Sequence, residues 1–206
     1  MKYYAGIGSR DTPKNVLLKM RDIASFLELN NFILRSGGAK GADTAFESGV
    51  VNPELKNIYL PFRNFNGHKS DNKSYIYVEK GDPELDPAFY SLKLHPSKGK
   101  MNDTAKAMMM RNYFQIHGLK DQSKSQFVIC WTPDATNGKT ILTSWDSGGS
   151  GQAIRIAAIN NIPVYNLADE RYKDMMIIDF VDLVLYNFKN NIHPDLIIQE
   201  TTKKLF

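Results

Sequence analysis

Three glycine-rich segments each follow an apolar, strand-like run and precede a helix-like run, and they constrain the fold more than any other feature. They are residues 6–10 (GIGSR), 36–43 (SGGAKGAD) and 147–152 (SGGSGQ). Glycine allows positive φ and lets a backbone approach a ligand closely. A helix that begins at such a turn directs unpaired N–H groups and the positive end of its dipole toward that ligand. The three turns therefore predict strand-to-helix connections that bind a phosphate-bearing ligand.

The segments between these turns alternate between strand and helix patterns. Strands are predicted at residues 2–7, 32–34, 57–60, 127–131 and 162–165. Helices are predicted at about residues 13–30, 42–48, 102–117 and 152–160, the first with a capping residue in Asp11-Thr12 and Pro13 at its first position. Such alternation favours a single α/β domain, a mostly parallel sheet with helices on both faces.

Two stretches depart from this alternation. Residues 62–100 carry Pro83, Pro87 and Pro96 among mixed aromatic and polar residues, so we expect an ordered functional insert within a core of residues 1–170. Residues 171–206 are expected to form a C-terminal helical extension packed on the core. It would contain one helix, a break at His193-Pro194 and a second short helix.

Composition narrows the functional classes. The chain has 206 residues, 42% of them hydrophobic, and a formal charge of +4, which by itself is too small to argue for nucleic acid. The one cysteine, Cys130, lies in an apolar run and is expected to be buried, and no apolar stretch suggests a signal peptide or a membrane span. We therefore expect a cytoplasmic protein, in the host cytoplasm if a phage encodes it. The four histidines follow no metal-ligand spacing, so neither a metal nor a cofactor is expected beyond a nucleotide or sugar phosphate as ligand.

The turns and one helix supply the candidate ligand contacts. Ser9 offers a hydroxyl, Arg10 a bidentate phosphate contact and Lys40 a neutralising charge, although the first turn could also be purely structural. Asp43 could cap the following helix or hold a sugar hydroxyl. Arg111 lies among apolar helix residues and must reach water, a carboxylate or a ligand. The candidate ligand-binding residues are Gly8, Ser9, Arg10, Ser36, Gly37, Gly38, Lys40, Gly41, Asp43, Arg111, Asn112, Gly148, Gly149, Ser150, Gly151 and Gln152.

Arg155 is expected within the first turn of the helix that follows Gly151. A cation near a helix amino terminus is unfavourable for the helix dipole. The arginine therefore indicates either a partner anion or a surface salt bridge.

Six short motifs occur in an order that resembles a known superfamily. They are residues 4–10 (YAGIGSR), 34–39 (LRSGGA), 41–43 (GAD), 60–61 (LP), 111–112 (RN) and 148–153 (GGSGQA). Over most of residues 2–166 the chain resembles the SLOG superfamily, which groups the DNA-processing protein A (Smf) family with the LONELY GUY and lysine-decarboxylase-like nucleotide hydrolases. More narrowly, it resembles the phage- and bacterium-encoded DNA-processing-A-like branch. The resemblance implies a Rossmann-like sheet with a nucleotide or sugar-phosphate pocket at the carboxyl ends of the strands.

The resemblance to LONELY GUY enzymes also bears on catalysis. These enzymes cleave the N-glycosidic bond of nucleoside monophosphates, with the pattern Pro-Gly-Gly-x-Gly-Thr-x-x-Glu and a catalytic Glu. In this chain Ser147 stands for the Pro, Gln152 for the Thr and Arg155 for the Glu. A cation in place of the carboxylate argues against the same hydrolysis mechanism. Asp43, Glu47 and Asp146 are the candidate catalytic substitutes.

Three functional hypotheses follow. The first is a protein that binds a nucleotide or nucleotide-derived phosphate. The second is a nucleotide N-glycosidase or phosphoribohydrolase with a rearranged carboxylate. The third is a single-stranded DNA binder in recombination, because DNA-processing A proteins bind single-stranded DNA and load a recombinase. The modest charge and the lack of a recognisable winged-helix tail weaken that third analogy. Self-association into a homo-oligomer is also expected.

Overall fold

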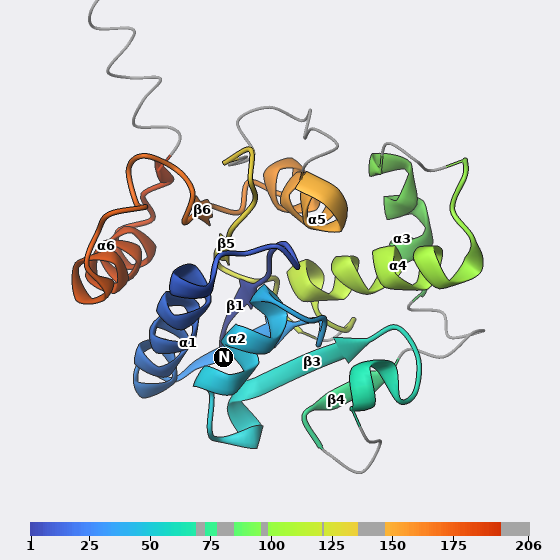
Figure 1. The fold of residues 1–206 in the computed structure, drawn as a ribbon, viewed down its shortest axis with the longest axis horizontal. Coiled ribbons are helices and arrows are strands. Elements are labelled where there is room, and N and C mark those ends of the chain that lie inside the picture. Colours follow the sequence, from blue (N-terminus) through green and yellow to red (C-terminus); the bar gives the residue numbers. More distant parts are fainter. Residues whose placement is uncertain (69–72, 78–84, 96–98, 121, 136–146, 195–206) are drawn as a thin grey trace, which may run out of the picture.

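A computed structural model of the chain describes residues 1–68, 73–77, 85–95, 99–120, 122–135 and 147–194 (Figure 1). Its strands all pair in parallel, in the order β4-β3-β2-β1-β5-β6. They are β1 (Lys2–Gly6), β2 (Phe32–Ser36), β3 (Lys56–Leu60), β4 (Tyr75–Tyr77), β5 (Val128–Cys130) and β6 (Val164–Asn166). The helices are α1 (Lys14–Leu29), α2 (Ala42–Gly49), α3 (Leu85–Ser91), α4 (Asp103–His117), α5 (Gly148–Ile159) and α6 (Ile177–Lys189). Short 3₁₀ turns are η1 (Pro53–Leu55), η2 (Phe65–Gly67) and η3 (Leu92–Leu94).

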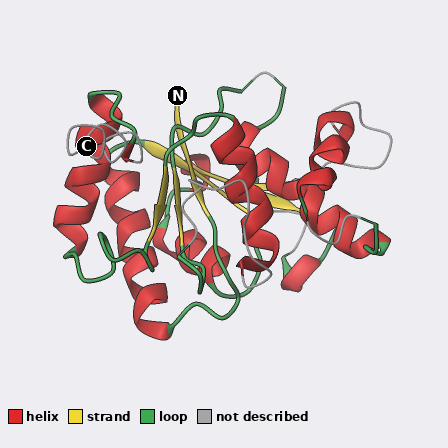
Figure 2. Cartoon of the chain, turned by 90° about the horizontal axis from the view of Figure 1, so that it is seen from above, coloured by secondary structure: helices red, strands yellow, loops and turns green. Residues whose placement is uncertain are grey.

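Helices cover both faces of the sheet, as Figure 2 shows from above. α1, α2 and α6 pack on one face around the buried side chains of Tyr4, Phe32 and Phe127. α4 and α5 cover the other face of the central strands, and α3 packs on α4. Neighbouring residues of one strand, such as Tyr4 and Ala5, thus enter different cores, which explains the unbroken apolar runs in the sequence. The predicted α/β domain with a parallel, Rossmann-like sheet is confirmed.

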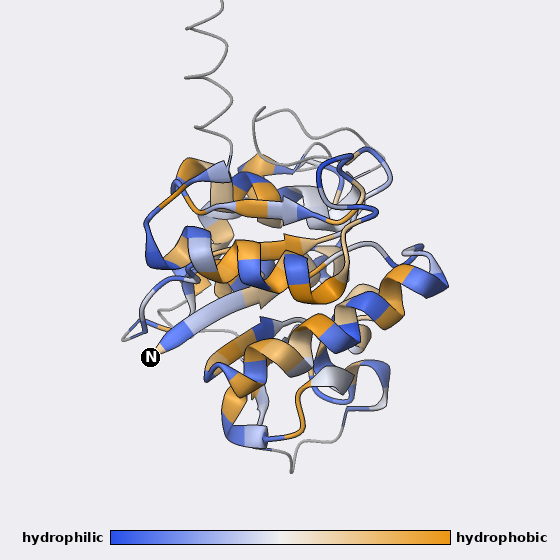
Figure 3. Ribbon diagram, turned by 90° about the vertical axis from the view of Figure 1, so that its left-hand side faces the viewer, coloured by the Kyte–Doolittle hydropathy of each residue, from blue (hydrophilic) through white to orange (hydrophobic). Residues whose placement is uncertain are grey.

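Helices in Figure 3 carry both hydrophobic residues, in orange, and hydrophilic residues, in blue. α1 buries Met20, Ile23, Ala24 and Leu27, which recur at the spacing of one helix face. The amino terminus of α1 has no side-chain hydrogen bond at its cap. The stability of α1 therefore comes mainly from the packing of its buried face.

The start of α1 differs from the sequence prediction. Pro13 is the N-cap residue, and the helix begins one residue later, at Lys14. Thr12 instead donates its hydroxyl to the Ser9 carbonyl at 2.7 Å. The predicted capping residue therefore stabilises the preceding glycine turn rather than the helix.

The segment 62–100 contains more regular structure than the sequence indicated. β4 adds a strand at the edge of the sheet, pairing Ile58 with Tyr75, and α3 packs on α4. Both elements are short, which hides their periodicity. Pro87 lies within the first turn of α3, where a missing N–H costs nothing.

Towards the C-terminus, α6 packs on α1, and its buried residues join the same core. The second short helix expected after Pro194 lies outside the described residues. No helix in the described part of the chain is long and apolar enough to cross a membrane.

Three helices end in a pair of asparagines. α1, α5 and α6 have C-cap residues Asn30, Asn160 and Asn190, and in each case the next asparagine has positive φ, between 53° and 58°. Asparagine tolerates this left-handed conformation better than most residues with a side chain. The pairs therefore terminate these helices and turn the chain back, toward β2 after α1 and toward β6 after α5.

Candidate ligand-binding site

A cavity of about 540 Å³ lies at the carboxyl ends of β1, β2 and β5. From β1 the chain passes through α1, on one face of the sheet, to β2, which neighbours β1. From β5 the chain passes through α5, on the opposite face, to β6, so the strand order grows in the opposite direction. Such a reversal of strand order is the position at which open α/β sheets bind ligands. We call this space the switch-point cavity.

The structure brings nine of the sixteen sequence-predicted ligand contacts to the lining of the switch-point cavity. They are Gly8, Ser9, Arg10, Asp43, Arg111, Asn112, Gly148, Gly149 and Ser150. The other seven are not part of the lining: Ser36, Gly37, Gly38, Lys40, Gly41, Gly151 and Gln152. Lys40 is exposed, whereas Ser36 is fully buried and donates to the Gly6 carbonyl at 2.8 Å.

The first two glycine turns pack against each other. A Cβ on Gly8 would lie 2.7 Å from the Ala42 Cβ, and one on Gly41 would lie 2.8 Å from the Arg10 Cα. Gly41 also has φ of +88°, which side chains rarely adopt. These glycines allow close packing of backbone on backbone, which places Ser9 and Arg10 beside the start of α2.

Arg111 of α4 forms an ion pair with Asp43 of α2. Its Nη1 donates to Asp43 Oδ2 at 3.1 Å, and the two side chains are 10% and 5% exposed. The Ala39 amide donates to the same oxygen at 3.2 Å. Burial raises the pKa of the Asp43 carboxyl, while Arg111 and the Ala39 amide oppose that rise by stabilising the charged form.

This ion pair changes the interpretation of Asp43. The α2 N-cap is Gly41, and no side chain caps the helix, so the capping alternative is wrong. Gly37 lies against the same guanidinium, since a Cβ there would lie 1.2 Å from Arg111 Nη1 and would displace it. With its amide oriented to satisfy its neighbours, Gln115 accepts from the Gly37 amide at 2.8 Å and from Arg111 at 3.3 Å.

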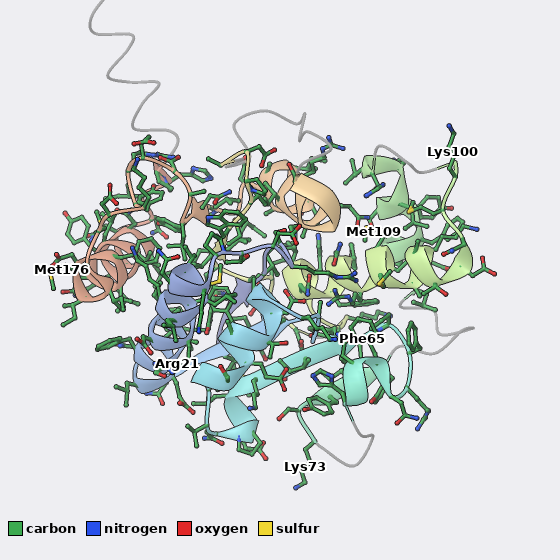
Figure 4. All side chains as sticks on the ribbon, in the orientation of Figure 1. Arg21, Phe65, Lys73, Lys100, Met109 and Met176 are labelled. Atoms are coloured by element: carbon green, nitrogen blue, oxygen red, sulfur yellow. The ribbon has the colours of Figure 1, made fainter. Side chains whose placement is uncertain are left out.

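A second polar network joins α4 to α5. The buried Asn112 amide donates to the Gly149 carbonyl and to Gln152 Oε1, each at 3.1 Å. Gln152, which is 1% exposed, donates in turn to the Ser91 carbonyl at 3.0 Å. Met109 lies between α4 and α5 in Figure 4, against Gly149. This network holds the amino end of α5 at the cavity.

The position of Arg155 corrects the sequence interpretation. α5 begins at Gly148, so Arg155 lies in its third turn rather than its first. Its side chain is buried and donates to the Leu94 carbonyl of η3, and it does not line the switch-point cavity. Desolvation lowers the pKa of the Arg155 guanidinium. The argument from the helix dipole therefore does not apply.

Of the two candidate catalytic carboxylates that the structure describes, Asp43 lines the cavity and Glu47 does not. Asp43 is paired with Arg111. Glu47 lies outside the lining, where it contacts His68 Nε2 at 3.2 Å and accepts from the Tyr75 hydroxyl at 3.1 Å. Asp146 lies outside the described residues. Among the residues that are described, no group of His, Cys, Asp and Glu side chains could hold a metal ion.

Several lining residues were not predicted. They are Ile7, Asp11, Ala39, Met108, Met109, Gln115, Pro133, Ser147 and Ala153. Helical spacing could have predicted the lining residues of α4, because residues 108, 111, 112 and 115 lie on one face of the helix. Asp11 follows the first glycine turn directly and places an exposed carboxylate at the cavity.

The fold and the cavity define an α/β protein with a ligand site at the switch point of a parallel sheet. No protein-family model matches the sequence, and no curated protein sequence matches it. Among solved structures, the fold is similar to that of DNA processing protein A from Helicobacter pylori, a protein with a unique single-stranded DNA binding mode. The TM-score is 0.57 and the identity 18%, over 90% of this chain and 81% of the other. The chain therefore has a fold like that of DNA processing protein A.

Proposed function

We propose that the chain binds a nucleotide or a sugar phosphate in the switch-point cavity. The main observation in support is that the first turn of α5, Gly148 to Ser150, lines this cavity together with Arg10 and Arg111. The first turn of a helix has amide groups without intrahelical partners, and these bind anions. The volume of about 540 Å³ lies in the range of small-molecule sites. The narrower membership in the SLOG superfamily and its phage branch is part of this proposal.

Calorimetric titration with ribose 5-phosphate and the four ribonucleoside 5′-monophosphates tests the proposal. Arg10→Ala should weaken binding by about tenfold, the usual loss when one charge-assisted hydrogen bond is removed. Lys14→Ala is the matched control, because Lys14 is an exposed cation of the neighbouring α1 outside the cavity lining. No binding of any of these compounds, or equal losses in both variants, would refute the proposal.

Hydrolysis of the bound nucleotide is a second candidate function, and the position of Asp11 favours it. Asp11 is an exposed carboxylate in the cavity lining, whereas Asp43 is held by Arg111. A carboxylate near the glycosidic carbon can stabilise positive charge or activate water. Release of free base from a monophosphate, lost in Asp11→Asn, would support turnover. A complete lack of released base would leave binding alone.

Single-stranded DNA is the other candidate ligand, and it is supported by the fold shared with DNA processing protein A. Phosphate contacts make such binding depend steeply on salt. Affinity for an oligonucleotide should then fall as salt rises and should increase with oligonucleotide length. Affinity that is independent of salt and length would exclude this candidate.

A further inference from the structure

A cavity at the carboxyl end of α4 is separate from the switch-point cavity. Its volume of about 410 Å³ lies in the range of small-molecule sites, and it shares no lining residue with the switch-point cavity. Pro87 of α3 and the last turn of α4 line it, together with the segment that leads from α4 toward β5. We call this space the α4-end cavity.

The lining of the α4-end cavity carries positive charge. Lys120 and Lys124 line it with exposed side chains, and the His117 imidazole lines it as well. The Lys124 ammonium donates to Asn160 Oδ1, a neutral acceptor, at 2.6 Å. Among the described residues of this lining there is no carboxylate. The lining therefore offers cations without an anionic side chain beside them.

A buried arginine lies directly behind this lining. Arg35 of β2 is fully buried, and a Cβ on Gly118 of the lining would lie 2.2 Å from Arg35 Nη2. The guanidinium donates to Gln122 Oε1 at 3.0 Å and to the Ser125 hydroxyl at 3.4 Å. Its carbon lies 3.8 Å from the centroid of the Tyr3 ring, and its Nε has no hydrogen-bond partner in the described part of the chain. All these contacts are with uncharged groups.

The charge of Arg35 is therefore poorly compensated. Arginine stays protonated in proteins, and a buried charge without a counter-ion is unfavourable. The carboxyl end of α4 supplies the equivalent of about half a negative charge, whereas Arg35 and Lys124 each carry a full positive one. Burial, followed by the charges of Lys124 and Arg35, lowers the pKa of His117 to about 4. An anion in the α4-end cavity would offset this excess of positive charge.

The remaining lining favours an aromatic body on that anion. The rings of Tyr113 and His117 stack with centroids 4.2 Å apart and planes 6° apart. Phe114 and Leu119 line the same space. Aromatic and aliphatic side chains of this kind pack well against a flat ring.

We propose that the α4-end cavity binds an aromatic acid, a flat ring that carries one anionic group. The ring packs on the apolar lining, and the anionic group faces Lys124 and His117. A bound anion stabilises the imidazolium form of His117, so ligand binding and protonation of His117 favour each other reciprocally. This site is independent of the proposed function, because it lies outside the switch-point cavity.

The ionisation of His117 tests the proposal, with benzenesulfonate as the probe because it stays charged at every pH used. NMR follows the imidazole resonance of His117, identified by its loss in His117→Gln, at several pH values between about 7.5 and 5. Saturating probe should raise the pKa of His117 from about 4 to about 5, the effect of an opposite charge nearby. At a pH of about 5 the protonated fraction should then rise from about a tenth to about a half.

Benzenesulfonamide is the matched neutral compound, similar in shape, and should leave the pKa of His117 unchanged. Lys124→Gln should weaken benzenesulfonate binding by about threefold, the scale of one exposed ion pair. Lys189→Gln is the control variant, because Lys189 is an exposed cation of α6 outside the lining, and it should bind like the wild type.

Three results would overturn the proposal. They are an unchanged pKa of His117 at saturating or millimolar benzenesulfonate, equal effects of the charged and the neutral compound on this pKa, and equal losses of affinity in the two lysine variants. None of them bears on ligand binding in the switch-point cavity, so the two proposals fail separately.

Discussion

The Arg111 guanidinium and the Asp43 carboxylate meet at 3.1 Å in a place that water barely reaches, with side chains 10% and 5% exposed. The two residues are 68 positions apart in sequence. Their contact joins α4, on one face of the sheet, to α2, on the other, across the carboxyl edge. A buried ion pair of this kind costs more when one partner is lost than when both are replaced.

Arg111→Met should lower the free energy of unfolding by about 3–5 kcal/mol, because it leaves the buried Asp43 carboxylate without its partner. Urea denaturation followed by circular dichroism measures this change. The double variant Asp43→Leu/Arg111→Met should recover most of the loss, since no buried charge remains. A double variant that loses the sum of the two single losses would show that the ion pair does not couple these residues.

Gly37→Ala should destabilise the protein by about 1–3 kcal/mol, the usual cost of overpacking. The new Cβ would lie 1.2 Å from Arg111 Nη1 and would displace the guanidinium from Asp43. Gly99→Ala is the control, because its Cβ meets nothing within 4 Å. Similar midpoints of thermal unfolding for the two variants would contradict this account of Gly37.

The free energy of unfolding should decrease as the pH falls from about 6.5 to about 4, because His117 is neutral in the native protein over this range. Burial and the nearby charges of Lys124 and Arg35 lower the pKa of His117 from its ordinary 6.5 to about 4. Between these values the unfolded chain binds a proton that the native protein does not, so stability is complete above pH 6.5 and is lost progressively toward pH 4.

The variant His117→Phe isolates this contribution, because phenylalanine can keep the stack on Tyr113, whose ring centroid lies 4.2 Å away. Thermal unfolding at several pH values between about 7.5 and 5 should show a shallower loss for the variant than for the wild type. Parallel curves would assign the acid sensitivity to other groups.

Cys130 should not react with a thiol reagent in the native protein. It is fully buried in β5, and burial raises the pKa of its thiol, which suppresses the reactive thiolate. Labelling with Ellman's reagent should therefore proceed at the rate of unfolding and become fast in denaturant. Rapid labelling without denaturant would contradict the burial.

Local patterns predicted the architecture because each main strand and helix has a clear apolar periodicity. The first turn of α5 was missed, since three glycines in four residues indicate a loop, and glycine has a low helix propensity. Tertiary packing of Gly149 on Met109 and the hydrogen bond from Asn112 override that propensity. The error carried over to Arg155, which was placed at the wrong end of the helix.

The candidate site was predictable where a residue belongs to a turn and not where it depends on a distant partner. Ser9, Arg10 and Ser150 reached the cavity lining as part of their glycine turns. The pairing of Arg111 with Asp43 has no local signal, because nothing near either residue specifies the other. A further cavity, of about 430 Å³, also required the fold, since its lining joins β3 and β4 to two helices from a later part of the chain.

Asn31 and Asn161 lie at the edge of the sheet opposite to the switch-point cavity, because Asn31 directly precedes β2 and Asn161 precedes β6. Two tight reversals thus lie at one edge of the sheet, and the turns that line the cavity lie at the other. We therefore expect substitutions of Asn31 or Asn161 to change thermal stability without altering the lining of the switch-point cavity.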